Sequence, residues 1–175
     1  MSSVELLIYD LIIKFGFPFV LICLIFKGLL IGKFIPATTL ISTYMIITGN
    51  TEIIDILLIC LVTSSATTTG ETIIFSQCKN PNPKVSKFLP NRVNDLLDKD
   101  TEETKISKLL DKFSNNIGLT IFIGNIITGV RGFAAIPAGR NQYNTYKFIS
   151  ISYVSTFIYH VVLTYIIITG FNFIL

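Results

Sequence analysis

Apolar residues along this chain form runs that are long enough to cross a bilayer or to enter it partway. The longest clean runs are 53–76 and 148–168, each close to the ~20 residues that a membrane-spanning helix needs. In segment 4–15, apolar residues instead recur at helical spacing, while Asp10 and Lys14 share the opposite side. These patterns predict two transmembrane helices and, ahead of them, an amphipathic helix lying at the membrane interface.

Two other apolar segments are interrupted. Segment 17–48 is broken by Lys33 and Pro36, and segment 117–139 is broken by a glycine-rich stretch that follows Ile127. Two short apolar arms around a break are typical of a re-entrant hairpin rather than of two full crossings. We therefore predict two hairpins, with tips near Pro36 and near 129–137.

The two halves of the chain repeat the same order of elements. Ile35-Pro36-Ala37 matches Ile136-Pro137-Ala138 at an offset of 101 residues. A second amphipathic helix is expected at 103–113, so each half contains an amphipathic helix, a broken hairpin and a full span. An odd number of crossings in each half would invert one repeat relative to the other, a plan that recurs in transporters.

The predicted fold class is therefore an all-α integral membrane protein built from two inverted repeats. We expect a single domain over residues 1–175, with repeats at about 1–78 and 105–175 and a polar connection at about 79–104. Composition agrees, since 51% of residues are hydrophobic, 14% are charged and the mean hydropathy is +0.66. A soluble domain usually carries ~25% charged residues, so a bilayer is the better solvent for this chain.

More than half of the charge lies in one stretch. Between Lys79 and Lys112 there are eight Lys and Arg residues and six Asp and Glu residues. The interspersed acids and the apolar flanks argue against a nucleic-acid partner. Because basic residues near the ends of spans are retained inside the cell, we expect loop 79–112 to be cytoplasmic in a multi-pass protein of the cell membrane.

Glu71 and Arg131 are the two charges hardest to explain as solvated. An ionisable group at membrane depth costs several kcal/mol, so it normally faces a cavity or a partner. Gly129 and Gly132 flank Arg131 and allow backbone N–H groups to turn toward a ligand, while the guanidinium grips a phosphate at two points. This combination predicts a site for a phosphate-bearing lipid headgroup. The alternative is that Arg131 only pairs with Glu71 to lock the fold.

Other chemistry is not indicated by the sequence. The three cysteines are far apart and make no metal-ligand motif, so we expect neither a metal nor a cofactor. There is no nucleophile beside a base and no phosphate-binding loop, so an enzyme is not expected. His160, a lone imidazole in an apolar helix, is interpreted as a core residue.

The second broken segment resembles the signature of the DedA (VTT-domain) family. Residues Phe122 to Arg131, then Pro137-Ala138-Gly139 and Phe148, are similar to F-x-x-R-x-x-P-G-x-R, x-P-A-G and a later Phe. In the first half, Pro36 matches the Pro of the family's P-G-E turn, and Gly70-Glu71 matches its Gly-Asp/Glu. The resemblance extends from Phe15 to Gly170.

This resemblance implies a protein that moves lipids between leaflets, as bacterial members do in recycling undecaprenyl phosphate and eukaryotic relatives do as scramblases. We thus expect a flippase or scramblase for a polyprenyl phosphate or a phospholipid, with membrane lipids as partners and homo-oligomerisation left open. Combining the resemblance with the residue pattern, the expected substrate-binding residues are Arg131, Glu71, Gly129, Gly132, Asn125, Pro137, Gly139 and Pro36.

The chain departs from the family pattern at three positions. Asn125 stands where the family has its first Arg, Thr128 replaces a Pro, and Thr38 falls on the acid of the P-G-E turn. Candidates for proton coupling are then Glu71, Glu52 and Asp55. Two alternatives remain open, namely a proton- or ion-coupled transporter of small solutes and a membrane scaffold that transports nothing.

Overall fold

The computed structural model describes residues 3–30, 37–50, 52–87, 89, 116–127 and 132–174, and their side chains between residues 10 and 170. All regular structure in these ranges is helical, as expected for an all-α protein. Three predicted site residues, Pro36, Gly129 and Arg131, lie outside the described residues. The same holds for Thr128, for the expected helix at 103–113 and for most of the polar connection.

The first helix, α1 (Ser3–Gly28), consists of two limbs. Gly16 has φ 63° and ψ −148°, a conformation that a residue with a side chain rarely adopts, and it interrupts the helix. Pro18 follows in the first turn of the second limb, where its missing N–H needs no partner. The break falls directly after segment 4–15, where the sequence predicts that the amphipathic helix ends.

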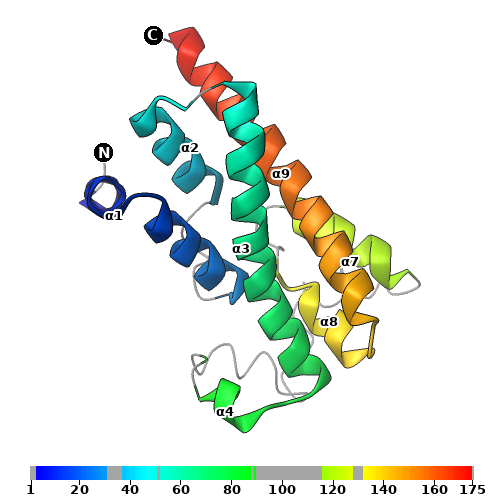
Figure 1. The fold of residues 1–175 in the computed structure, drawn as a ribbon. Coiled ribbons are helices and arrows are strands. Elements are labelled where there is room, and N and C mark those ends of the chain that lie inside the picture. The colour runs from blue at the N-terminus through cyan, green and yellow to red at the C-terminus, as the bar shows by residue number, and fades with distance from the viewer. Residues whose placement is uncertain are drawn as a thin grey trace.

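Two long helices, α3 (Ile53–Lys79) and α9 (Thr145–Ile174), lie side by side and run antiparallel (Figure 1). At ~1.5 Å per residue they are about 40 Å and 45 Å long. Their register follows from two contacts, one between Glu71 and Ser152 and one between Thr63 and His160. As residue numbers rise on α3 they fall on α9, which makes the pair antiparallel.

The remaining helices flank this pair. The second limb of α1 packs on α3, and α2 (Ala37–Thr48) packs on α9 and α1 (Figure 1). On the other side, α7 (Ile117–Ile126) packs on α9, and α8 (Ala135–Arg140) packs on the C-terminal half of α3. One helical turn, α4 (Pro83–Ser86), follows α3.

Two apolar cores result, one at each end of the α3–α9 pair. One core contains Phe75 and Phe148, whose rings stack with centroids 4.3 Å apart, together with apolar side chains of α7 and α8. The other contains Leu24, Ile41 and Ile56 from α1, α2 and α3. The polar side chains described below lie along the α3–α9 interface between them.

Three helices are long and apolar enough to cross a membrane, at Asp10–Gly28, Ile53–Lys79 and Thr145–Gly170. Gly16 divides the first of these, and the limb after it covers only ~18 Å of the ~30 Å hydrocarbon core. Helices α2 and α7 are also too short, at about 18 Å and 15 Å. Of the described helices, α3 and α9 are the two that are long and apolar enough to span without interruption.

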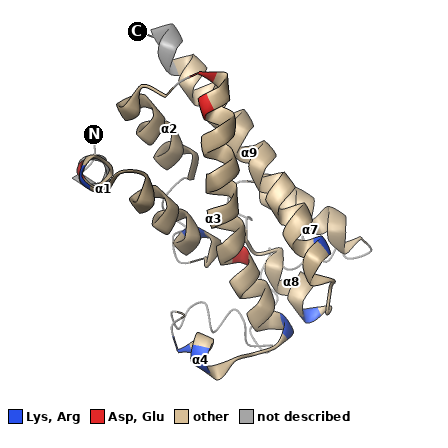
Figure 2. Cartoon of the chain, viewed as in Figure 1, with Lys and Arg blue, Asp and Glu red and all other residues tan. Residues whose placement is uncertain are grey.

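The outward faces of the long helices suit lipid. Large apolar side chains are exposed there, among them Ile54, Leu58, Val162 and Ile166. Figure 2 shows Lys, Arg, Asp and Glu mostly near the ends of the described helices, with one acidic position in the body of α3. That position is Glu71, which lies between Asp55 in the first turn of α3 and Lys79 in its last. The chain therefore has the surface and the helix lengths of a membrane protein.

Candidate functional site

A stripe of buried polar side chains runs along the interface of α3 and α9. On α9 successive members are one, three or four residues apart, and on α3 they are one or three apart, so each set stays on one helix face. The stripe consists of Thr63, Ser64, Thr67, Thr68 and Glu71 on α3, and of Ser152, Ser155, Thr156, His160 and Thr164 on α9. It forms a hydrophilic path inside a bundle whose outer surface is apolar.

Glu71 is the centre of the first polar cluster. Its carboxylate is 1% exposed, and its Oε2 accepts hydrogen bonds from Ser152 Oγ and, at 3.3 Å, from Asn125 Nδ2. The same amide nitrogen of Asn125 donates to Ser152 Oγ at 2.9 Å and to Ser155 Oγ at 3.2 Å. Side chains from α3, α7 and α9 thus converge on one carboxylate, which is the arrangement that a buried acid requires.

The end of α1 reaches this cluster because two glycines touch. A Cβ added to Gly28 would lie 2.9 Å from Gly70 Cα and 3.0 Å from the backbone nitrogen of Glu71, and one added to Gly70 would lie 2.8 Å from Gly28 Cα. Small residues at such a crossing let two helix backbones approach closely in a membrane. The Gly70-Glu71 pair therefore combines a helix contact with a buried acid.

Both broken segments approach each other at the same level. Leu30 follows α1 with φ 63°, and Gly132 precedes α8 with φ 83°. A Cβ added to Gly132 would lie 2.8 Å from Leu30 Cδ2 and 3.7 Å from the carbonyl oxygen of Gly28. Leu30 and Gly132, which are about a hundred residues apart in sequence, are therefore neighbours close to the contact of Gly28 with Gly70 of α3.

A second polar cluster surrounds His160, which is fully buried. Its Nδ1 lies 3.3 Å from Thr63 Oγ1 and 3.3 Å from Ser64 Oγ. Both hydroxyls also donate to the backbone oxygen of Cys60, at 3.2 Å and 2.6 Å. His160 is thus a buried ring whose Nδ1 has partners on the facing helix, in agreement with its interpretation as a core residue.

The structure brings together some of the predicted site residues. Asn125 contacts Glu71 directly, and Gly132 lies against Leu30 at the end of α1. Gly139 serves packing, since a Cβ there would lie 2.6 Å from the oxygen of Phe75. Pro137 is half-buried in α8.

Glu52 and Asp55 occupy a different part of the molecule from Glu71. Glu52 is exposed and Asp55 is half-buried at the first turn of α3, where an acid complements the helix dipole. Asp55 precedes Glu71 by 16 residues, which is about 24 Å along the helix. Neither acid shares the buried cluster of Glu71.

Ser152, Ser155 and His160 are polar contacts that the sequence analysis did not assign to the site. The signal for them is periodic, because positions 152, 156, 160 and 164 are polar at intervals of four in an apolar helix. Single Ser and Thr residues in such helices often bond only to their own backbone, as Thr169 does. The interval of four becomes informative only when the facing helix carries a matching stripe.

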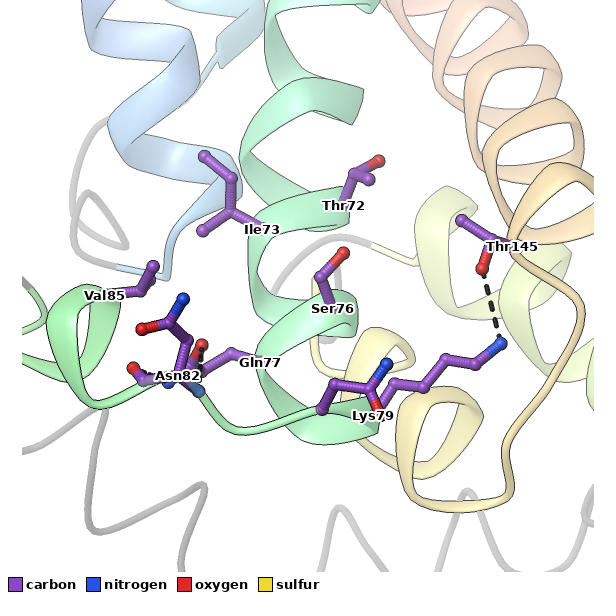
Figure 3. A pocket seen from close by; sticks show the side chains of 9 residues that line it. Thr72, Ile73, Ser76, Gln77, Lys79, Asn82, Val85 and Thr145 are labelled. Carbon is purple, nitrogen blue, oxygen red and sulfur yellow. Dashed lines mark hydrogen bonds between the residues drawn. The ribbon is translucent and has the colours of Figure 1, made fainter.

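A pocket of about 360 Å³ lies at the C-terminal end of α3 (Figure 3). Its floor includes Lys79, whose Nζ donates to the backbone oxygen of Tyr143 at 2.7 Å and to Thr145 Oγ1 at 3.3 Å. Gln77 and the backbone of Asn82 form a reciprocal pair of hydrogen bonds. The bonds of Gln77 hold the start of the polar connection against the end of α3, and those of Lys79 hold the start of α9 there.

In the part of the chain that the structure describes, no group of three or more His, Cys, Asp and Glu side chains gathers to hold a metal. Comparisons with protein-family models, with curated proteins and with solved structures found no match to this chain. The resemblance to the DedA signature thus depends on the motifs themselves. The site is defined by its own geometry, as a buried carboxylate where two broken segments meet between two long membrane helices.

Proposed function

We propose that this protein is a transporter that moves a phosphate-bearing lipid, a polyprenyl phosphate or a phospholipid, between the leaflets of the cell membrane. The observation that carries the proposal is the place of Glu71, a carboxylate 1% exposed beside the junction of both broken segments. A buried acid in a membrane is expensive to maintain and usually marks a substrate or ion pathway. The similarity to the DedA signature supports the same function.

In this proposal, the second limb of α1 with α2, and α7 with α8, are two re-entrant hairpins of inverted repeats. Three observations support this. Each of these helices is too short to cross the hydrocarbon core, Leu30 and Gly132 are neighbours near Glu71, and α3 and α9 are antiparallel. Non-helical backbone at membrane depth is tolerated where it is covered by protein or lines a cavity, which suits a substrate site at the junction.

Arg131 is proposed to bind the lipid phosphate from the second break. It immediately precedes Gly132, which contacts Leu30 beside Gly28 and Glu71. Glu71 would hold the guanidinium when the site is empty and release it when a phosphate arrives. A fixed positive charge at this depth lowers the barrier for a headgroup where the hydrocarbon raises it most.

The test is lipid translocation in liposomes that contain the purified protein. Arg131→Ala is expected to reduce the rate about 10- to 100-fold, which corresponds to losing a hydrogen-bonded charge worth ~1.5–3 kcal/mol. Arg131→Lys keeps the charge but loses the planar, two-point contact with the phosphate. Its translocation rate should therefore lie between that of the parent protein and that of Arg131→Ala. Lys84→Ala, which removes an exposed charge on α4, is the matched control and should keep the parent rate. A parent rate in Arg131→Ala would overturn the site assignment.

One observation favours the second candidate, a scaffold that transports nothing. Asn125 and Ser152 bond both to Glu71 and to each other, as expected of a polar network that only holds helices together. The liposome experiment separates the two, because a scaffold gives no translocation from the folded parent protein under any gradient. A transporter must instead rearrange this network when substrate enters.

A further inference from the structure

His160 is the one histidine of the chain, and the proposed lipid site does not use it. The nearby hydroxyls determine which ring nitrogen carries its proton. Thr63 and Ser64 give their single hydroxyl protons to the backbone oxygen of Cys60, so they act as acceptors toward Nδ1. The network therefore assigns the proton of the neutral ring to Nδ1, and a second proton would bind to Nε2.

The path from His160 to Glu71 is lined by hydroxyls. On α3, Thr68 lies between Ser64, which contacts His160, and Glu71, which contacts Ser152, so all three share the face toward α9. On α9, Thr156 lies four residues from Ser152 and four from His160. Thr68 is 4% exposed and Thr156 is fully buried.

These two hydroxyls have a further property in common. Neither Thr68 Oγ1 nor Thr156 Oγ1 has a hydrogen-bond partner among the residues that the structure describes. Burying a hydroxyl without a hydrogen-bond partner costs about 1–3 kcal/mol of folding free energy. Two such hydroxyls at the same helix interface therefore indicate that water lies between the helices and bonds to them. Ser152 and His160 are eight residues apart, about 12 Å along α9, and the two threonines stand midway.

We propose that His160 and Glu71 share one exchangeable proton across the α3–α9 interface, relayed by water held at the hydroxyls of Thr68 and Thr156. In the forward step the O–H bond of the protonated Glu71 breaks and an N–H bond forms at Nε2 of His160. The products are a carboxylate and an imidazolium, and each relaying hydroxyl or water accepts one proton and donates another. The role of this proton as a coupling ion rests on the proposed lipid function. The proton site itself can be tested without measuring transport.

No charged side chain of the described neighbouring helices competes with this pair at the level of His160. Tyr159 is its neighbour on α9, with ring centroids 6.0 Å apart, and Cys60 faces it from α3. The described α2 carries Tyr44 as its titratable group, and α7 carries none. On α1, Lys27 adjoins Gly28 and so lies at the level of Glu71, while the other described charges of α1 are Asp10 and Lys14 near its first limb.

Solid-state NMR of the full chain labelled with ¹⁵N-histidine, in phospholipid bilayers, reports this one ring directly. We expect a neutral Nδ1–H ring at high pH that becomes imidazolium when the pH is lowered. A carboxylate ~12 Å away at an effective dielectric constant of ~20 changes proton affinity about tenfold. Glu71→Gln should therefore lower the proton affinity of the ring about tenfold, and Glu52→Gln, at the exposed end of α3, should leave it unchanged.

A second pair of variants tests the relay without removing a charge. Thr156→Val should slow exchange of the ring proton about tenfold, the factor for one hydrogen bond lost to the bridging water. Thr164→Val removes a buried hydroxyl on the far side of His160 and should leave the rate unchanged. A ring that stays neutral at every pH at which the protein remains folded, an equal affinity in Glu71→Gln or equal rates in the two threonine variants would each overturn the proposal. Loss of lipid translocation in liposomes with an intact titration would instead refute the lipid function alone.

Discussion

The hydrogen bond between Ser152 and Glu71 joins the two long helices at the buried carboxylate. We expect a double-mutant cycle of Glu71→Gln and Ser152→Ala to give a coupling energy of about 0.6–1.7 kcal/mol, between the mean and the maximum measured for such bonds in a membrane bundle. Free energies of unfolding in mixed micelles with a denaturing detergent provide the measurement. Ser65→Ala, whose hydroxyl is exposed and donates to Leu61 of its own helix, is the control partner. Strictly additive effects for Glu71 and Ser152 would show that the bond is absent.

At the scale of elements, the contact of Gly28 with Gly70 determines how closely α1 approaches α3. Replacing Gly70 by Ala raises helix propensity by up to ~1 kcal/mol, but the new Cβ meets the backbone of α1, and overpacking of this kind costs about 1–3 kcal/mol. Gly70→Ala should therefore lower the free energy of unfolding. Gly170→Ala lies in open space near the end of α9 and should be neutral or stabilising. The same unfolding assay checks both, and an unchanged stability in Gly70→Ala would exclude a close backbone contact.

At the scale of the whole molecule, the long helix α3 should place its two ends on opposite sides of the membrane. We expect a cysteine at Glu52 to be labelled by an impermeant maleimide on intact cells, and a cysteine at Ser86 only after permeabilisation, because the basic connection is retained inside. The native Cys23, Cys60 and Cys78 must first be replaced, preferably by alanine. Labelling of both positions from one side would show that α3 does not span. The reverse pattern would place the connection outside the cell.

Much of the architecture is encoded locally. Hydropathy alone places spans at 53–76 and 148–168, where α3 and α9 lie, because a helix in lipid must cover its backbone with apolar side chains whatever its neighbours are. Gly16 marks the interruption of α1 because a positive φ suits a residue without a side chain. The order of short and long apolar segments is likewise visible in the sequence. The repeats and hairpins remain proposals, since Pro36 and 129–131 lie outside the described residues.

The candidate site was predictable only in part. Glu71 stands out in the sequence because a charge inside a span needs an explanation, and Asn125 stands out through its place in the motif. Ser152 and His160 do not, because a serine or a lone histidine in an apolar helix is commonly satisfied within its own surroundings. Their contacts with Glu71 and with Thr63 and Ser64 depend on how α9 is positioned against α3.

The sequence by itself thus determined that a bilayer is the better solvent for this protein, where its long helices lie, and that one acid lies within a long apolar helix. These properties follow from composition and spacing within single segments, where each residue acts through its own transfer free energy and backbone preference. The tertiary structure decided that Gly28 meets Gly70, that Gly132 meets Leu30 near Glu71, and that His160 faces hydroxyls of α3. Such pairings join residues up to about a hundred positions apart, and they depend on packing geometry that no single segment contains.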